Sequence, residues 1–124
     1  MSQAEAAGSD IGGLFAAIDA QDSAAFVSYL TSGAVFRFGS APPVQGREAI
    51  QAAVDGFFES IDSLSHSITR TLCEDDVVFC EGEVTYRRHD GTKIELPFAN
   101  IFEYAGDLID HYKIYIDIGP LYTE

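Results

Sequence analysis

The run LSHSITRTLC, at residues 64–73, opens the part of the chain that decides the fold. It is followed by VVFCEGEVTYRR (77–88), IELPFANIFEY (94–104) and LIDHYKIYIDI (108–118). In each run apolar and polar side chains alternate with a period of two, which is typical of strands that bury one face. Short polar turns separate the runs, so we predict four antiparallel strands joined by hairpins.

Helical patterns come before these strands. Apolar side chains recur at i, i+3, i+4 and i+7 in residues 11–18, and a similar stripe runs along residues 47–60. A short helix is expected to begin after Asp22, and residues 34–38 are expected to form a strand that ends before the two prolines at 42–43. Helices followed by hairpins predict an α+β fold with three N-terminal helices packed on an antiparallel sheet.

The length and charge of the chain limit its organisation and partners. Its 124 residues suffice for one domain, which we place at residues 9–124 after a flexible tail at residues 1–8. Twenty acidic residues against seven basic ones give a net charge of −13, which repels phosphate backbones and anionic lipid surfaces. No apolar run is long enough to span a bilayer. We therefore expect neither nucleic acid nor a membrane as a partner.

The two cysteines are expected to be free thiols. The predicted hairpin places Cys73 opposite Val78 and Cys80 nearer Thr71, which is too far apart for a disulfide. Free thiols fit a reducing compartment, and the first eight residues lack the apolar core of a signal peptide. We therefore expect a cytoplasmic location.

Two stretches resemble the nuclear transport factor 2-like (SnoaL-like) superfamily: VFRFGSAPPVQGREAI at residues 35–50, and GDLI at 106–109 with YID at 115–117. Together with the order of elements, the resemblance covers about residues 10–120. It implies a cone-shaped fold in which a curved sheet wraps the third helix and leaves a pocket between them. Members include ketosteroid isomerases, epoxide hydrolases, polyketide cyclases, dehydratases and non-catalytic domains, so the fold alone does not choose the function.

Asp117 is the first candidate for a catalytic residue, because it follows an apolar strand in which a buried carboxyl group would act as an acid or base near neutral pH. Family enzymes often carry an acid at the matching position. Tyr115 shares its strand parity and is expected to donate a hydrogen bond to a substrate oxygen. The alternatives are an Asp117 that caps a turn and a Tyr115 that packs in the core.

Glu83 is the third catalytic candidate. The resemblance to epoxide hydrolases implies that Glu81 and Glu83, two residues apart on one strand, match part of an Asp–Arg–Asp arrangement that deprotonates water. The arginine of that arrangement is missing here. The alternative is a solvated acidic face.

Asn100 is a candidate for binding a substrate carbonyl, because it shares parity with two phenylalanines that are expected to face inward. The alternative is that its amide bonds the backbone or a water molecule. Phenylalanines are expected to form the apolar wall of the pocket: Phe15, Phe36, Phe57, Phe98 and Phe102. The three histidines form no local metal-binding motif, so we expect no metal and no cofactor. The roles of His66 and His111 are left open.

The last strand also suggests a homodimer. Ile114, Ile116 and Ile118 alternate on the face opposite Tyr115 and Asp117, and an exposed stripe of this kind indicates sheet-to-sheet association. The alternative is that a helix covers the stripe.

Taken together, the sequence predicts a pocket protein for a small, mainly apolar molecule. It is either a cofactor-independent isomerase, hydrolase, cyclase or dehydratase, or a non-catalytic binding or association domain.

Overall fold

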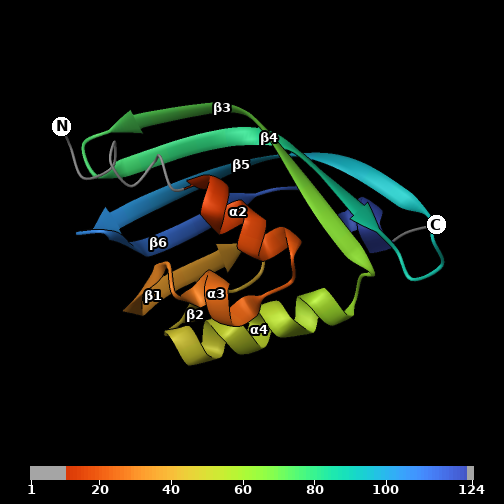
Figure 1. The fold of residues 1–124 in the computed structure, drawn as a ribbon, viewed down its shortest axis with the longest axis horizontal. Coiled ribbons are helices and arrows are strands. Elements are labelled where there is room, and N and C mark those ends of the chain that lie inside the picture. The colour runs from red at the N-terminus through yellow and green to blue at the C-terminus, as the bar shows by residue number, and fades with distance from the viewer. Residues whose placement is uncertain (1–10, 123–124) are drawn as a thin grey trace.

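The structure, a computed structural model, describes residues 11–122. Three helices lie on one side of a curved, six-stranded sheet (Figure 1): α2 (Ile11–Asp19), α3 (Ser23–Val27) and α4 (Arg47–Glu59). The strands are β1 (Leu30–Phe38), β2 (Val44–Gln45), β3 (Ser63–Glu74), β4 (Val77–Arg87), β5 (Lys93–Ala105) and β6 (Leu108–Tyr115), and a 3-10 helix, η1 (Gly119–Tyr122), follows them. The predicted α+β class is confirmed, whereas the predicted tail at residues 1–8 lies outside the described residues.

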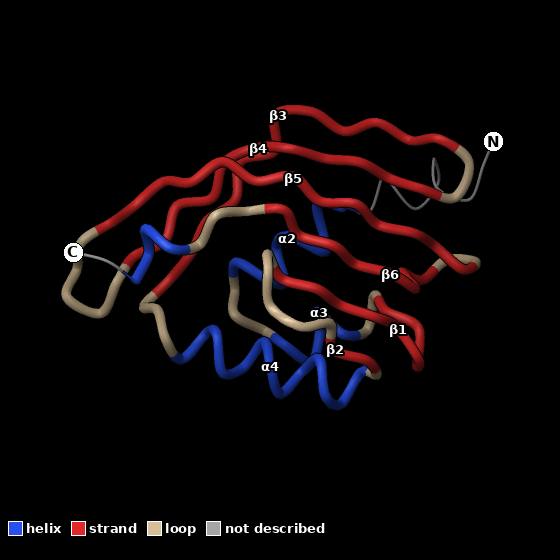
Figure 2. Tube along the Cα trace, turned by 180° about the vertical axis from the view of Figure 1, so that it is seen from behind, coloured by secondary structure: helices blue, strands red, loops and turns tan. Residues whose placement is uncertain are grey.

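The strands are ordered β2-β1-β6-β5-β4-β3 across the sheet. The predicted hairpins β3–β4, β4–β5 and β5–β6 are confirmed, and Cys73 lies opposite Val78 as expected. β1 pairs in parallel with β6, so the sheet is mixed, and Figure 2 shows the two strands side by side. The sequence did not predict this pairing or the short strand β2. Both depend on hydrogen bonds between segments that are distant in the chain, and such contacts leave no pattern within either segment.

A bulge bends the long β3–β4 hairpin. The register of β3 shifts between Ile68 and Arg70, opposite Gly82 of β4. A Cβ atom at Gly82 would lie 2.0 Å from the carbonyl oxygen of Ser67, so only glycine fits this close approach. Bulges bend a strand and increase its twist. We infer that the bend helps to bring His66, two residues before Ile68, against helix α2.

Aromatic side chains fill the core between the helices and the sheet. The ring of Tyr112, on β6, lies 4.6 Å from that of Phe102 and 5.6 Å from that of Phe26, in edge-to-face contacts. Phe36 of β1 packs on the same tyrosine, with centroids 5.2 Å apart. Such pairs add to the stability gained from burying the rings. This cluster connects β1, β5 and β6 to α3.

Candidate active site

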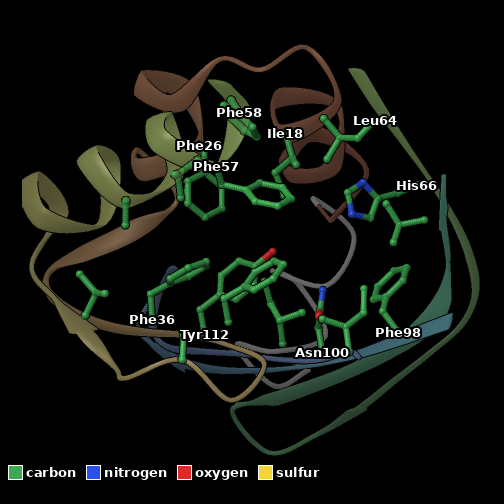
Figure 3. Close-up of a pocket in the computed structure, with 18 of the residues that line it drawn as sticks. Ile18, Phe26, Phe36, Phe57, Phe58, Leu64, His66, Phe98, Asn100 and Tyr112 are labelled. Atoms are coloured by element: carbon green, nitrogen blue, oxygen red, sulfur yellow. The ribbon is translucent and has the colours of Figure 1, made fainter. Parts of the chain in front are cut away.

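An apolar cavity of about 250 Å³ lies between the inner face of the sheet and the helices (Figure 3). Its aromatic and aliphatic wall is formed by Ile18, Phe26, Phe36, Phe38, Ala41, Pro42, Val44, Ala53, Val54, Phe57, Phe58, Leu64, Val84, Phe98, Ile114 and Ile116. Four lining side chains carry polar groups: His66, Tyr86, Asn100 and Tyr112. A mainly apolar cavity with a few polar groups is typical of a small-molecule site.

His66 forms a pair with Asp19 at one end of this cavity. The Oδ1 atom of Asp19 lies 2.6 Å from Nδ1 of His66, and Oδ2 accepts the backbone N–H of His66 at 3.0 Å. Asp19 is the last residue of α2, and His66 lies on the inner face of β3. The carboxylate therefore holds both the backbone and the ring of one residue. Because Nδ1 is engaged, Nε2 is the ring nitrogen left for a ligand.

The environment favours a neutral imidazole. Burial lowers the pKa of His66 below its ordinary value of 6.5, although the hydrogen bond and the charge of Asp19 act in the opposite direction. The side chain of His66 is only 10% exposed, which explains why the loss of hydration dominates. Near neutral pH the proton is then on Nδ1, beside the carboxylate, and Nε2 carries a lone pair. Such a nitrogen can act as a general base.

Asn100 provides a second polar group in the cavity wall. The residue is 2% exposed, and its side-chain amide points into the cavity in Figure 3. Its Oδ1 atom has no hydrogen-bond partner among the described residues. An unsatisfied buried carbonyl costs roughly 1–3 kcal/mol, so this position sacrifices stability. Such sacrifices are concentrated at functional sites.

Two tyrosines complete the polar lining. Burial raises the pKa of Tyr86 and the pKa of Tyr112 well above the ordinary value. Both phenols therefore stay protonated over the physiological range and keep a proton to donate. The cavity thus combines one basic nitrogen with several neutral hydrogen-bond donors.

A family model for the SnoaL-like domain matches residues 11–112. The chain belongs to the SnoaL-like domain family. The match spans most of the chain, including both Asp19 and His66, and it confirms the resemblance seen in the sequence. No curated protein matches the sequence.

This SnoaL-like domain is also similar to several solved structures. A candidate polyketide cyclase from Xanthomonas campestris pv. campestris has a TM-score of 0.87 and 17% identity, over 97% of this chain and 96% of that one. A candidate SnoaL-like polyketide cyclase from Jannaschia sp. CCS1 has a TM-score of 0.81 and 20% identity, over 93% and 88%. TerC, co-crystallised with polyporic acid, has a TM-score of 0.82 and 12% identity, over 93% and 94%. At these identities the likeness shows a shared fold.

The SnoaL-like domain brings together part of the predicted binding set. Asn100, Phe36, Phe57 and Phe98 all line the cavity. Phe102 is fully buried in the aromatic cluster around Tyr112 and is not among the lining residues. Phe15 packs behind His66, with ring centroids 4.8 Å apart, and lines a groove on the other side of that histidine.

The predicted catalytic residues lie outside the cavity lining. Asp117 follows the end of β6, is exposed, and accepts the backbone N–H of Gly119 at 3.1 Å. Tyr115 is 55% exposed on the outer face of the sheet. Glu83 is exposed on the outer face of β4, where a hydrogen bond and charge repulsion from Glu95 raise its pKa. The expectation that Asp117 sits in an apolar environment is therefore wrong.

The inward and outward faces of the last strand were assigned the wrong way round. Ile114 and Ile116 line the cavity, because Ile114 lies opposite Asn100 across β5 and β6. Burying the isoleucines removes more apolar surface from water than burying Tyr115 and Asp117 would. The exposed isoleucine stripe that suggested a homodimer is therefore absent from the described sheet.

Asp19 was missed by sequence reasoning, and His66 was left without a role. Two signals pointed to them. Asp19 stands four residues after Phe15, on the edge of the apolar stripe of its helix. His66 shares parity with Leu64 and Ile68, so it faces inward with them. What joins the two is the contact between α2 and β3, which the sequence does not reveal.

Within residues 11–122, no group of three or more His, Cys, Asp or Glu side chains is arranged to hold a metal ion. In the same part of the chain, no helix has the length and apolar character needed to span a membrane.

Proposed function

We propose that this SnoaL-like domain binds a small, mainly apolar carbonyl compound and catalyses proton transfer on it without a cofactor. The observation that carries the proposal is the Asp19–His66 pair at the wall of an apolar cavity. A base held by a carboxylate at an apolar cavity is an effective arrangement for removing a proton from carbon. The cavity volume suits a molecule with one or two rings. The polyketide cyclase descriptions of two structural neighbours support this class of reaction.

His66 is the general base in this mechanism. Its Nε2 atom takes a proton from the carbon next to the substrate carbonyl, and the electron pair of the broken C–H bond moves to the carbonyl oxygen as an enolate. Asp19 stabilises the imidazolium ion that forms and keeps the ring oriented, without itself reacting with the substrate. Return of the proton to another atom of the enolate gives an isomer, and attack of the enolate carbon on a second carbonyl gives a ring.

Neutral donors stabilise the enolate oxygen. The amide group of Asn100 and the hydroxyls of Tyr86 and Tyr112 belong to the cavity wall, and each can donate a hydrogen bond to a substrate oxygen. Among apolar side chains such donors act strongly on developing charge. Phe36, Phe57 and Phe98 position the apolar body of the substrate. Asn100 therefore keeps the carbonyl-binding role that its sequence suggested, as a proposal.

Solvent deuterium exchange tests the proposal without knowledge of the natural substrate. We would incubate the protein in heavy water with enolisable ketones of one or two rings, such as 2-tetralone and 2-indanone, and follow loss of the α-proton signal by NMR. We expect exchange above the buffer rate for the wild type, and near the buffer rate for His66→Gln. His111→Gln is the matched control, since His111 shares strand parity with the exposed Tyr115 and so lies on the outer face of the sheet. Equal exchange in both histidine variants would rule out His66 as the base.

The same samples distinguish a non-catalytic binding domain. A ketone that raises the melting temperature binds the folded state. Binding without any exchange above the buffer rate would support the binding-domain alternative and contradict proton transfer. Asp117→Asn belongs in the same series, because loss of exchange in that variant would support the role predicted for Asp117 from the sequence. We expect its exchange rate to equal that of the wild type.

We also propose that the domain forms a homodimer through the outer face of its sheet. A row of side chains from neighbouring strands crosses this face. It begins with Leu72 and Phe79, which are 59% and 42% exposed, and continues to Ile101, Lys113 and Arg37. The apolar end of the row is accompanied by acidic residues on β4, whereas the other end carries Arg37 and Lys113, the latter paired with Glu103 at 3.3 Å. A two-fold axis through the face sets the basic end of one copy against the acidic part of the other.

A further inference from the structure

One part of the cavity wall lies beyond the ends of the strands. Ile116 lines the cavity, although strand β6 and its ladder with β5 both end at Tyr115. The same isoleucine also lines a hollow on the outer surface, together with the exposed residues Ser40 and Tyr115. Ile116 therefore stands between the interior and the surface.

The turn that follows β1 packs directly against Ile116. Gly39, the first residue after β1, has a positive φ of 58°. A Cβ atom at Gly39 would lie 3.2 Å from the carbonyl oxygen of Ile116, and the backbone N–H of Gly39 donates to the carbonyl of Ile114 at 2.9 Å. A side chain at Gly39 would strain the backbone and displace Ile116. This close approach holds Ile116 from one side.

The 3-10 helix η1 fastens the chain on the other side of Ile116. Leu121, in η1, is only 3% exposed. Two atoms of the Arg88 guanidinium bind this helix: Nε donates to the carbonyl of Leu121 and Nη2 donates to the carbonyl of Pro120, both at 2.9 Å. Hydrogen bonds from a charged donor are stronger than neutral ones. They fix the chain a few residues beyond Ile116.

Arg88 is itself held in the turn that joins β4 to β5. Its backbone N–H donates to the carbonyl of Thr92 at 2.7 Å, and its Nη1 donates to the hydroxyl of Thr92 at 3.1 Å. Asp90 accepts the backbone N–H and the hydroxyl of Thr92 at 2.9 and 2.6 Å. Arg88 therefore fastens η1 to a well-ordered turn of the sheet, near the end marked C in Figure 2.

We infer that Ile116 sets the largest ketone that the cavity accepts, and that Arg88 is a positioning residue, which holds Ile116 in the wall by fastening η1. The inference rests on the proposed function for the chemistry of the ligand. The side chain of Ile116 occupies space that a larger ligand would need, and close-packed walls respond even to single methylene groups. Because Ile116 lies outside the ladder, its position can change while the strands and the core stay in place.

The ratio of two dissociation constants tests the size limit. It is the constant for a three-ring ketone, 2-tetralone with one further fused benzene ring, divided by the constant for 2-tetralone itself. Ile116→Ala enlarges the cavity, so we expect the ratio to fall roughly tenfold or more. Ile118→Ala is the matched control, because that isoleucine is partly buried and is not among the lining residues. The same ratio in both variants would overturn the inference.

Arg88→Met tests the positioning role, because methionine keeps a long side chain and removes the donors to η1. We expect the ratio to fall as in Ile116→Ala, and the backbone amide of Leu121, which donates to Ile118, to exchange its hydrogen faster. Arg87→Met is the matched control, since Arg87 is half-exposed and pairs with Asp62 at 3.7 Å.

The ratio separates positioning from a merely structural role. A general loss of stability weakens the binding of both ketones alike and leaves the ratio unchanged. In the double variant Ile116→Ala/Arg88→Met the ratio should equal that of Ile116→Ala alone, because Arg88 acts through Ile116. An unchanged ratio in Arg88→Met would overturn the positioning role, even where the amide of Leu121 exchanges faster.

Failure of the proposed function gives a different result. A wild type that binds neither ketone would contradict the proposed function. Naphthalene and anthracene then replace the two-ring and three-ring ketones, and the same ratio is measured in the same variants. A ratio that falls in Ile116→Ala and stays constant in Ile118→Ala supports the size limit without any carbonyl chemistry, and equal ratios overturn it.

Discussion

The carboxylate of Asp19 binds two separate groups of His66: Oδ2 accepts its backbone N–H at 3.0 Å and Oδ1 lies 2.6 Å from its ring nitrogen Nδ1. The residues are far apart in the sequence, at the end of α2 and on β3. Two contacts to one residue fix the ring more firmly than a single contact, because the backbone bond anchors the carboxylate. This relationship sets both the tautomer and the orientation of the candidate base.

Asp19→Asn tests this relationship. The amide keeps the size of the carboxylate and loses its charge, so it no longer favours a proton on Nδ1 or stabilises an imidazolium ion. We expect ketone exchange to fall by roughly 10²-fold or more, within the range of general acid–base effects. Nitrogen-15 NMR of the imidazole reports the tautomer and should show a shift of the proton toward Nε2. Asp117→Asn is the control, and an unchanged tautomer in Asp19→Asn would contradict the orienting role.

The pH dependence of stability reports the burial of His66. Its pKa is lowered in the folded state, so the unfolded chain binds a proton at higher pH than the folded one. The free energy of unfolding should therefore decrease as the pH falls through about 6.5, the ordinary value, until the lowered pKa of the folded state is reached. Urea unfolding at pH values from about 8 to about 5, on either side of the ordinary histidine pKa, measures how steeply the free energy of unfolding changes with pH.

His66→Gln should flatten that slope in the same window, because glutamine does not titrate. His111→Gln removes a histidine of the outer face and is the control for the general effect of pH. A slope that is as steep in His66→Gln as in the wild type would show that other groups cause the loss of stability.

Gly82 and Gly56 should respond in opposite ways to alanine. A Cβ atom at Gly82 would lie 2.0 Å from the carbonyl oxygen of Ser67, so Gly82→Ala has to displace the β3 bulge. We expect a loss of roughly 2–4 kcal/mol, in the range of severe backbone and packing defects. Nothing lies within 4 Å of a Cβ at Gly56, within α4, so Gly56→Ala should stabilise the fold by up to about 1 kcal/mol. Denaturant titrations of both variants measure the difference.

Asn100→Leu should separate stability from binding. The substitution removes a buried carbonyl oxygen that lacks a partner, together with the weak hydrogen bond between the side chains of Asn100 and Cys80, and leucine has a similar size. We expect the free energy of unfolding to rise by about 1 kcal/mol, and the affinity for ketones to fall because a donor to the carbonyl is lost. Melting temperatures with and without 2-indanone measure both effects. A variant that is less stable and still binds the ketone as well as the wild type would contradict this account.

Phe79→Glu tests the proposed homodimer. The substitution places a charge in the apolar part of the outer face, at a side chain that is 42% exposed in the single chain. We expect the wild type to have twice the mass of one chain by light scattering and the variant to have the mass of one chain, because a buried unpaired charge opposes association. Ala52→Glu, at an exposed position on helix α4, which lies on the other side of the sheet, introduces the same side chain and is the control. A wild type that is a monomer would contradict the proposal.

Much of the fold followed from local patterns. The apolar stripe of α4 and the alternation in β3, β4 and β5 were recognised because each element is amphipathic along its own length. The inner residues of β5 were assigned correctly, since Phe98 and Asn100 line the cavity. The inner and outer faces of β6 were predicted wrongly, because apolar side chains occur on both faces of that strand, for example Tyr112 and Tyr115. Its register against β5 settled the question.

The candidate base was also beyond the reach of local sequence patterns. The sequence singled out Asp117 because a carboxyl group near an apolar strand suggests a raised pKa, yet β6 ends at Tyr115 and Asp117 caps the turn that follows. It left His66 without a role because a lone histidine on a strand has no spacing to interpret. Only the approach of α2 to β3 supplies its partner.

The sequence by itself determined the α+β class, the hairpins and the apolar character of the interior, because these depend on periodicity and composition within short segments. The tertiary structure decided the parallel pairing of β1 with β6, the inward face of β6 and the Asp19–His66 pair. These features join residues that are distant in the chain, and their energies depend on which surfaces meet. A pattern within one segment carries no record of that partner.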